Sequence, residues 1–396
     1  MKTIEFKLYL KPAQTETLVS WMRTCCHLFN LALEQRMKAY KRRGEPVGYN
    51  QQQTLLTKQR GRIQKLASIP VEFERDALRR VDRGMQAFFR RIKAGAGKVG
   101  FPRFRSWKRY NSLEYAAAGQ YVRGDNLLLI PKLGLVRIRC GKQRISKTQR
   151  LLRIIRRASG WYGQVVVDEV TTIKNLVDHG AVGIDVGLES FATLSDGSQI
   201  QNPRFYRKAE KKLRGLQRSL SRKKKGSRNR HKAVIRVRRQ HEKTASQRRN
   251  FCHQHSTELV RRFTFIAVEK LNIKGLARTH LAKSVHDAGW NQFLSQLTVK
   301  AANAGRLVVA VNPSGTSQTC PDCGAVKKKS LSEREHICSC GLRCHRDHAS
   351  ARVILDRALV ATGVNRLWRD STADSSLVVT DQVSPSKQED VLLASR

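Results

Sequence analysis

Three acidic residues occupy positions where carboxylates could hold metal ions. Asp185 and Glu269 each end an apolar run that is typical of a strand, and Asp347 follows a cysteine-rich segment. Two-metal cleavage of a phosphodiester needs carboxylates that converge on both ions, which lie about 4 Å apart. Strand ends hold side chains rigidly enough for this, so the pattern predicts a metal-dependent nuclease that uses Mg²⁺ or Mn²⁺.

Each acid also has an ordinary structural explanation. Asp185 could be a turn residue, Glu269 a charge at a sheet edge and Asp347 a helix N-cap. For any one acid this alternative stays open, whereas the three acids together favour a metal site. Gly183 and Gly187 flank the first acid and leave room for a phosphate backbone, and the strand–turn–strand around it fits a ribonuclease-H-like sheet.

Four cysteines form two close pairs further along the chain, Cys320 with Cys323 and Cys338 with Cys340. Four thiolates at tetrahedral distance make a closed structural zinc site. The second pair has one intervening residue instead of the usual two, so other residues remain candidates for the fourth ligand, namely Cys344, His336 and His345. The alternative is that these cysteines are merely buried.

The charge balance narrows the choice of partner. The chain has 396 residues, with 77 Lys and Arg against 31 Asp and Glu, which gives a formal net charge of +46. Polyanions relieve self-repulsion of this size, so we expect a nucleic acid. A membrane surface is the weaker alternative, because the sequence has no apolar run of about 18 residues.

The first ten residues alternate charged and apolar side chains and lack the apolar centre of a signal peptide. We therefore expect a cytoplasmic protein. In that compartment the nine cysteines would be metal ligands or free thiols rather than disulfides.

The first half of the chain predicts a small β-barrel that is interrupted by helices. A strand is expected over 2–10, followed by a basic helical lobe that begins at Pro12, where the missing N–H costs nothing. Short apolar runs separated by glycines then predict further strands over 127–130, 135–139, 151–155 and 164–167.

The second half predicts the strands and helices around the acids. A three-strand meander begins at 181, and a very basic helical hairpin over 207–249 turns near Gly226. Later elements follow from apolar periodicity, namely strands over 263–268 and 307–311 and helices over 290–301 and about 347–361.

Nine basic residues are the candidate nucleic-acid contacts. The arginines among them are expected to read a short motif beside the target, because arginine suits guanine edges and narrow grooves. The lysines are expected to lie along phosphates, and phosphate contact is the alternative for most of the arginines. The candidates are Arg75, Arg79, Arg80, Arg83, Arg103, Arg105, Lys223, Lys224 and Lys225. Aromatic residues among them, such as Trp107, could stack on bases.

With these residues assembled, the chain resembles TnpB, the small RNA-guided nucleases of insertion sequences, which are related to the type V CRISPR single-effector nucleases. The resemblance covers roughly residues 3–365, and its most specific motifs are Gly183–Gly187, Val268–Leu271, Thr316–Gly324 and Cys340–Asp347. Where the family often has Asn-Ala-Ala shortly after the third acid, this chain has His348-Ala-Ser.

The resemblance implies a multidomain α+β protein. A RuvC (ribonuclease-H-like) nuclease domain over 176–311 and 342–368 would carry a zinc-ribbon insert over 312–341. A wedge-like β-barrel over 1–11 and 96–175 would contain the helical recognition lobe of 12–95 as an insertion, and 369–396 would form a mobile tail.

The resemblance further implies an RNA-guided DNA endonuclease encoded by a transposable element. The three acids would bind Mg²⁺, and the four paired cysteines would bind Zn²⁺. One protein chain per guide RNA would cleave double-stranded DNA beside a short motif. We expect this in the prokaryotic cytoplasm, on the nucleoid when DNA is bound, and without any membrane partner.

Other functions fit parts of the pattern. An RNA-guided DNA-binding regulator would have lost acids that are intact here. A compact type V CRISPR effector would differ only in its genomic neighbourhood. A DNA-joining transposase fits this order of acids and zinc insert less well than RuvC does, and a plain RNA-binding protein would not need the acids.

Overall fold

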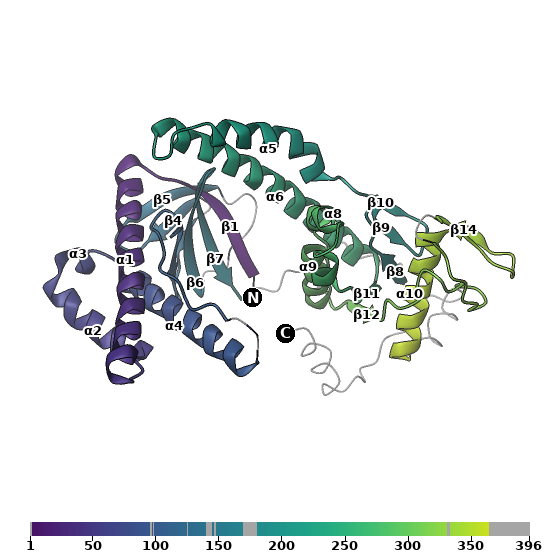
Figure 1. The fold of residues 1–396 in the computed structure, drawn as a ribbon, viewed down its shortest axis with the longest axis horizontal. Coiled ribbons are helices and arrows are strands. Elements are labelled where there is room, and N and C mark those ends of the chain that lie inside the picture. Colours follow the sequence, from purple (N-terminus) through teal and green to yellow (C-terminus); the bar gives the residue numbers. More distant parts are fainter. Residues whose placement is uncertain are drawn as a thin grey trace. The chain divides into compact units, whose positions relative to one another are not determined.

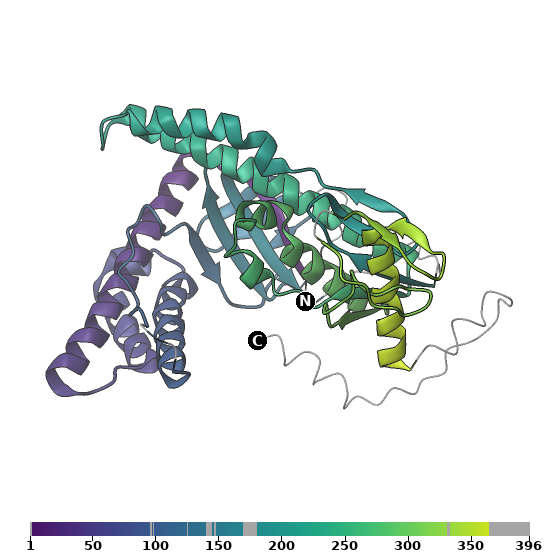
Figure 2. The same ribbon diagram turned by 45° about the vertical axis from the view of Figure 1, so that its right-hand side comes forward.

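The structure, a computed structural model, describes residues 2–95, 97, 99–124, 126–139, 145, 148–168, 180–330 and 333–363. The chain divides into two compact units, and Figure 1 and Figure 2 show their elements. Unit 1 comprises Met1–Thr172 and Ala209–Ser246, and unit 2 comprises Ile173–Lys208 and Gln247–Arg396. Both units combine helices with a β-sheet, so the expected mixed α and β architecture is confirmed.

Unit 1 contains a seven-stranded antiparallel sheet in the order β2-β6-β7-β1-β5-β4-β3. Alternate side chains of the first strand, Ile4, Phe6 and Leu8, are buried in the core, as the alternating sequence predicts. The strands are β1 (Lys2–Tyr9), β2 (Ser112–Tyr115), β3 (Val122–Arg123), β4 (Leu127–Ile130), β5 (Gly134–Arg139), β6 (Leu151–Arg157) and β7 (Gly160–Val167).

The helical lobe lies between β1 and β2 in the sequence. Its helices are α1 (Pro12–Arg43), α2 (Tyr49–Arg62), α3 (Gln64–Ala67) and α4 (Val71–Lys93). The first helix begins at Pro12 as predicted, and its C-cap is Gly44, whose φ of 67° suits glycine. The ring of Phe73 on α4 is fully buried, and its centroid lies 5.9 Å from that of Trp21 on α1.

Two long helices, α5 (Phe205–Ser221) and α6 (Arg228–Arg262), form the basic hairpin, and α6 is longer than the sequence predicts. The turn between them contains Gly226 with a φ of 88°, a conformation that side-chain-bearing residues rarely adopt. Within 209–246, which the structure describes throughout, the buried side chains are Leu213, Ala233 and Thr244. The other side chains of this stretch are half-buried or exposed, and many of them are Lys or Arg.

Unit 2 contains a five-stranded mixed sheet in the order β10-β9-β8-β11-β12. Its first three strands in the chain form the predicted antiparallel meander, and β8, β11 and β12 run parallel to one another. The strands are β8 (Ala181–Asp185), β9 (Ser190–Leu194), β10 (Gln199–Gln201), β11 (Phe265–Glu269) and β12 (Leu307–Val311).

Helices cover both faces of this sheet (Figure 1). Ile184 and Val268 share a core with Phe293 of α9 (Trp290–Asn303). Ala267, which alternates with Val268 along β11, packs instead with Ile354 of α10 (Arg346–Thr362). Both of these helices match the predicted periodicity, whereas the short helices α7 (Ile273–Leu276) and α8 (Ala282–Ala288) are not predicted by the sequence.

The cysteine-rich segment lies between β12 and α10 in the chain. It contains a small antiparallel hairpin of β13 (Glu335–Ile337) and β14 (Arg343–His345). Among the helices of the described residues, none is long and apolar enough to span a bilayer.

Three expectations about the architecture stay predictions: the closure of the seven-stranded sheet into a barrel, the ribonuclease-H-like assignment of the second sheet and the domain boundaries. Residues 169–175 of the expected barrel, residues 364–368 of the expected nuclease domain and the expected tail over 369–396 lie outside the described residues.

Candidate active site

Asp185 and Glu269 end neighbouring parallel strands. The strands β8 and β11 pair in register, with Ile184 opposite Val268, so the next residue on each strand is an acid. The apolar residues before the acids are buried in the core of unit 2 and fix both strands. Parallel strands present their carboxyl ends at the same edge of a sheet, so the two carboxylates are neighbours.

Helix α10 brings Asp347 to the same edge, because its first turn carries this residue. The helix approaches β8 so closely at Gly183 that an added Cβ would stand 2.0 Å from the carbonyl oxygen of Ala351, and only glycine fits there. Oδ2 of Asp347 lies 3.9 Å from the Cβ position of Gly187, two residues after Asp185. The structure therefore brings the three predicted acids together.

His345 is the N-cap of α10. Its Nδ1 accepts a hydrogen bond of 3.2 Å from the backbone N–H of Asp347. The alternative explanation of Asp347 as the N-cap is therefore wrong, and its carboxylate is not used to cap the helix.

Glu269 and Asp347 oppose the ionisation of Asp185. Burial raises the pKa of Asp185 well above its ordinary value, and the negative charges of Glu269 and Asp347 raise it further. Burial also raises the pKa of Glu269. Adjacent half-buried carboxylates need a positive counter-charge, and divalent cations that prefer oxygen ligands supply one. The donor set therefore fits magnesium or manganese.

Two polar residues that the sequence analysis missed contact the acids. Thr316 donates a hydrogen bond of 2.5 Å from Oγ1 to Oε1 of Glu269, which opposes the effect of burial on the pKa of that acid. Nε of Arg346 lies 3.5 Å from Oδ1 of Asp347. Both residues stand in motifs that carry the family resemblance, so their positions are visible in the sequence although their contacts are not.

Two arginines of α10 hold the segment that contains the cysteines. Arg346 donates to the carbonyl oxygen of Glu333 at 3.0 Å. Arg357 donates to the carbonyl oxygens of Asn312 and Ser314 at 3.1 and 2.6 Å. The helix that carries the third acid is therefore also bonded to the start of this segment and to the stretch between its two cysteine pairs.

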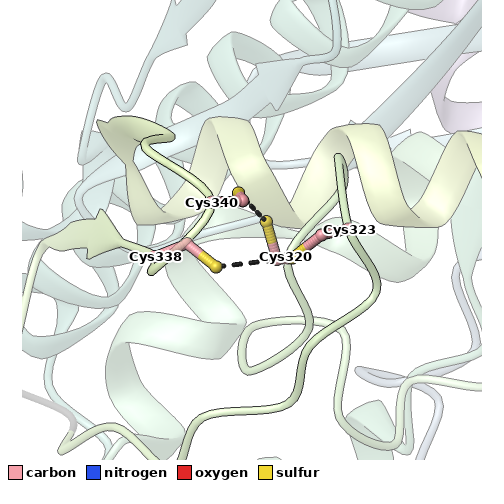
Figure 3. A group of neighbouring side chains, drawn as sticks. All are labelled: Cys320, Cys323, Cys338 and Cys340. Carbon is pink, nitrogen blue, oxygen red and sulfur yellow. Dashed lines mark hydrogen bonds between the residues drawn. The ribbon is translucent and has the colours of Figure 1, made fainter.

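The four paired cysteines gather in one cluster, as Figure 3 shows. Their sulfur atoms all lie within 4.8 Å of one another, with Cys320 3.7 Å from Cys340 and Cys323 3.5 Å from Cys338. Sulfur atoms around a tetrahedral zinc ion are about 3.8 Å apart, because each Zn–S bond is about 2.3 Å long. The cluster therefore fits a metal ion of this kind.

The fourth member of the cluster is Cys340, despite its unusual spacing from Cys338. The three other candidates for the fourth ligand either make different contacts or lie outside the cluster. His345 caps α10, and Nδ1 of His336 contacts Nζ of Lys329. Cys344 is not a member of the cluster.

Four of the arginines that are predicted to contact nucleic acid lie on α4, and each of them forms an ion pair with an acid of the same helix. The pairs are Arg75 and Arg79 with Glu72, and Arg80 and Arg83 with Asp76. The side chain of Arg80 is only 13% exposed, and its guanidinium lies 5.1 Å from the ring centroid of Tyr110. These contacts favour a structural role for Arg80, whereas the side chain of Arg83 is 57% exposed.

The other predicted contacts are exposed. Arg103 and Arg105 lie in the segment between α4 and β2, where the Asn30 side chain accepts from the N–H of Arg105 at 2.8 Å and donates to its carbonyl oxygen at 2.9 Å. Lys223, Lys224 and Lys225 lie in the turn between α5 and α6. Nucleic-acid contact by the nine basic residues stays a prediction.

Three family models match parts of the chain. A model described as a probable transposase matches residues 164–280, and the TNB domain of Cas12f1-like proteins matches 290–354. A helix-turn-helix domain matches 1–45, where the structure has β1 and the single helix α1.

Two relatives match along most of the chain. A protein of Streptomyces pristinaespiralis named "Putative RNA-guided DNA endonuclease" is 30% identical over 374 residues, which cover 91% of this chain and 90% of the relative. The Escherichia coli K12 protein named "Putative RNA-guided DNA endonuclease InsQ" is 27% identical over 360 residues, which cover 85% of this chain and 88% of the relative.

These matches define the class of protein, since they extend over both units and include the strands and the helix that carry the acids. The chain belongs to the TnpB-type family of RNA-guided DNA endonucleases.

A solved structure of a Cas12f1–sgRNA–target DNA complex aligns with 90% of this chain and 98% of its own, at 14% identity and a TM-score of 0.34. Similarity at this level supports no inference of its own.

Proposed function

We propose that this chain is an RNA-guided DNA endonuclease of a transposable element, with Asp185, Glu269 and Asp347 as ligands of two Mg²⁺ ions. The observation that carries the proposal is the parallel register of β8 and β11, with α10 packed on β8, which gathers three carboxylates at one sheet edge. Family membership supports the class of activity.

The chemistry follows from what the residues offer. When bound, two divalent ions would activate a water molecule and stabilise the leaving oxygen of the phosphodiester. The acids would supply the negative charge that holds the ions, and Thr316 would fix the orientation of the Glu269 carboxylate. The absence of a side chain on Gly187, beside Asp347, would leave space for a nucleic-acid backbone.

The sheet of unit 2 would then be the RuvC (ribonuclease-H-like) domain, and the cysteine segment would be its zinc-binding insert. A closed site of four thiolates has no open position for a substrate, so its Zn²⁺ would be structural.

A guide RNA fits the composition of the chain. Base pairing would supply the sequence information, so the protein would need mainly positive charge that faces the backbone and a reader for a short motif. The net charge of +46 supports a large nucleic-acid partner. We propose one protein chain per guide RNA and double-stranded DNA as the target.

Sequencing the RNA that co-purifies with the full chain would identify the guide, and a plasmid with the matching target and a randomised flank would then serve as substrate. Cleavage should require Mg²⁺ or Mn²⁺ and the guide.

Cleavage should be abolished by Asp185→Asn, Glu269→Gln or Asp347→Asn, with binding of RNA and DNA near normal. Glu34→Gln is the matched control, because this exposed acid pairs with Lys38 on α1, in unit 1. Target-specific cutting by the RNA-free protein would refute guidance by RNA, and wild-type cutting by one acid variant would remove that residue from the site.

A further inference from the structure

Most of the arginines that pack in unit 1 have an acidic partner. Arg36, Arg60, Arg153 and Arg157, for example, each form an ion pair with a carboxylate. Arg156, which is half-buried, and Arg23 and Arg238, which are exposed, form no ion pair with a carboxylate of the described residues. In a folded protein, unpaired guanidinium groups that gather in one place repel one another, so their position calls for an explanation.

The cluster surrounds Trp107, which is 39% exposed. The guanidinium carbon of Arg23 on α1 lies 4.5 Å from the centroid of its ring, and that of Arg156 on β6 lies 5.7 Å from it. The face of an indole ring attracts cations, so Trp107 holds the two guanidinium groups near each other in spite of their repulsion. Neither contact supplies a negative charge.

The third arginine is Arg238 on α6. Burial lowers the pKa of Arg156, and the positive charges of Arg23 and Arg238 lower it further, which places all three charges in one neighbourhood.

Hydrogen bonds to the β6–β7 turn hold α6 in this position. Arg239 donates from Nε to the carbonyl oxygen of Ala158 at 3.0 Å. The carboxylate of Glu242 accepts from the backbone N–H groups of Ala158 and Ser159 at 2.8 and 3.0 Å. Arg238 directly precedes one of these anchors, so the turn of α6 that carries it is held at the β6–β7 turn.

We infer that Arg23, Arg156 and Arg238 form a phosphodiester-binding site, in which Trp107 is the positioning residue. The inference rests on the proposed function, because nucleic acid is the ligand which that function supplies. Guanidinium groups bind phosphate oxygens through paired hydrogen bonds, so a bound phosphate replaces the repulsion among the three charges with attraction. Two guanidinium groups already lie over the indole ring, so its role is to orient them rather than to stack on a base.

The test measures how the binding of nucleic acid by the full chain depends on salt. Arg23→Gln, Arg156→Gln and Arg238→Gln are made singly and together. Arg150→Gln is the matched control, because Arg150 is an exposed arginine of the same unit that pairs with Asp168. The probes are a labelled single-stranded RNA and a labelled DNA duplex, both of mixed sequence.

Each phosphate contact adds about 0.7 to the slope of log K against log salt for a single strand, and about 0.9 for duplex DNA. The triple variant should therefore lose about 2 from the slope if the site binds the single strand, and about 3 if it binds the duplex. The control should keep the wild-type slope. A loss with RNA assigns the site to RNA and a loss with the duplex assigns it to DNA, whereas unchanged slopes with both probes would overturn the inference.

Thermal melting of the RNA-free chain separates a binding site from a structural cluster. The triple variant should melt no lower than the wild type, because it relieves repulsion. Arg153→Gln should melt lower, because it leaves the buried Glu114 without its partner. A fall in the triple variant as large as that of Arg153→Gln would show that the arginines are structural and would overturn the assignment.

Trp107 has its own test. Trp107→Leu should weaken binding of the same probe several-fold, and Trp107→Phe, which keeps a ring face for the guanidinium groups, should restore most of the affinity. Equal affinities of the two variants would overturn the positioning role. None of these measurements uses cleavage, so wild-type binding without guided cleavage would defeat the proposed function and leave the site standing.

Discussion

The side-chain hydroxyl of Thr316 donates a 2.5 Å hydrogen bond to the carboxylate of Glu269. Thr316 is buried, and it lies four residues before Cys320 in the sequence. The loop that carries it is held by Arg357 through the carbonyl oxygens of Asn312 and Ser314. The cysteine cluster and the acidic site are therefore joined by a short, bonded stretch of chain.

Thr316→Val should slow cleavage about tenfold, because a hydrogen bond to a charged group is worth about 1.5 kcal/mol. The hydroxyl bond opposes the rise that burial causes in the pKa of Glu269, so removing it raises that pKa further. The carboxylate then ionises only at higher pH, and the acidic limb of the pH–rate profile should move upward. Thr298→Val is the control, because its hydroxyl donates within α9, to the Leu294 carbonyl oxygen. An unmoved acidic limb would contradict the role given to Thr316.

Asp185→Asn should stabilise the metal-free protein at neutral pH. In the wild type, burial and the other two acids raise the folded-state pKa of the Asp185 carboxyl. The protonated carboxyl therefore contributes most to the stability of the fold below the ordinary carboxyl pKa of about 4. That contribution is lost as the pH rises through the raised folded pKa. Melting in chelator from about pH 4 to about pH 8 should therefore show a decline in the wild type that is smaller in the variant, and added Mg²⁺ should reduce the difference.

Asp196→Asn is a control that should change the melting temperature at neutral pH in the opposite direction. Burial tends to raise the pKa of Asp196, but hydrogen bonds from Ser198 and the charge of Arg262 outweigh it and lower the pKa. Its ionised form therefore stabilises the fold above the unfolded carboxyl pKa, and the variant should melt lower than the wild type at neutral pH. If both variants shift the melting temperature in the same direction, the electrostatic account of Asp185 is wrong.

The purified chain should contain one zinc ion, which elemental analysis would measure. Cys320→Ser combined with Cys323→Ser should lose the metal, and cleavage should fall as well, because Thr316 lies on the same stretch of chain. Cys344→Ser is the matched control and should keep the zinc, since Cys344 is outside the cluster. Zinc retained in the double variant, or lost in the control, would refute the ligand set.

Reading of the flanking motif should depend on exposed arginines and not on Arg80. Arg80→Gln should destabilise the chain by about 3 kcal/mol, because it removes one partner of the buried Asp76. It should leave the motif preference unchanged. Arg83→Gln and Arg103→Gln should alter the preference in at least one case in a randomised-flank cleavage assay. If both only weaken activity, these arginines contact phosphates and the motif reader lies elsewhere.

The sequence predicts the elements that carry the acids because each is a short apolar run with a clear end. Asp185 and Glu269 follow such runs directly, and their strands end at these residues. The first turn of α10 is predictable for the same reason, since its apolar periodicity begins next to Asp347.

Contacts between residues far apart in the chain could not be predicted from the sequence. The hydroxyl of Thr316 could have bonded only to its own loop, and nothing local indicates that it reaches Glu269. The arginines of α4 have the composition of a nucleic-acid helix, but Glu72 and Asp76 on the same helix pair with them. Reading basic residues without the nearby acids therefore overestimates the charge that is available to a ligand.

The three acids are far apart along the chain, at positions 185, 269 and 347, although the fold makes them neighbours. Because the ribosome delivers residues in order, the basic first segment of unit 1, Met1–Thr172, is synthesised before any of the acids. The third acid arrives only with α10. A nascent chain that ends before residue 347 lacks the third acid, so no translation intermediate of that length carries the full set of carboxylates.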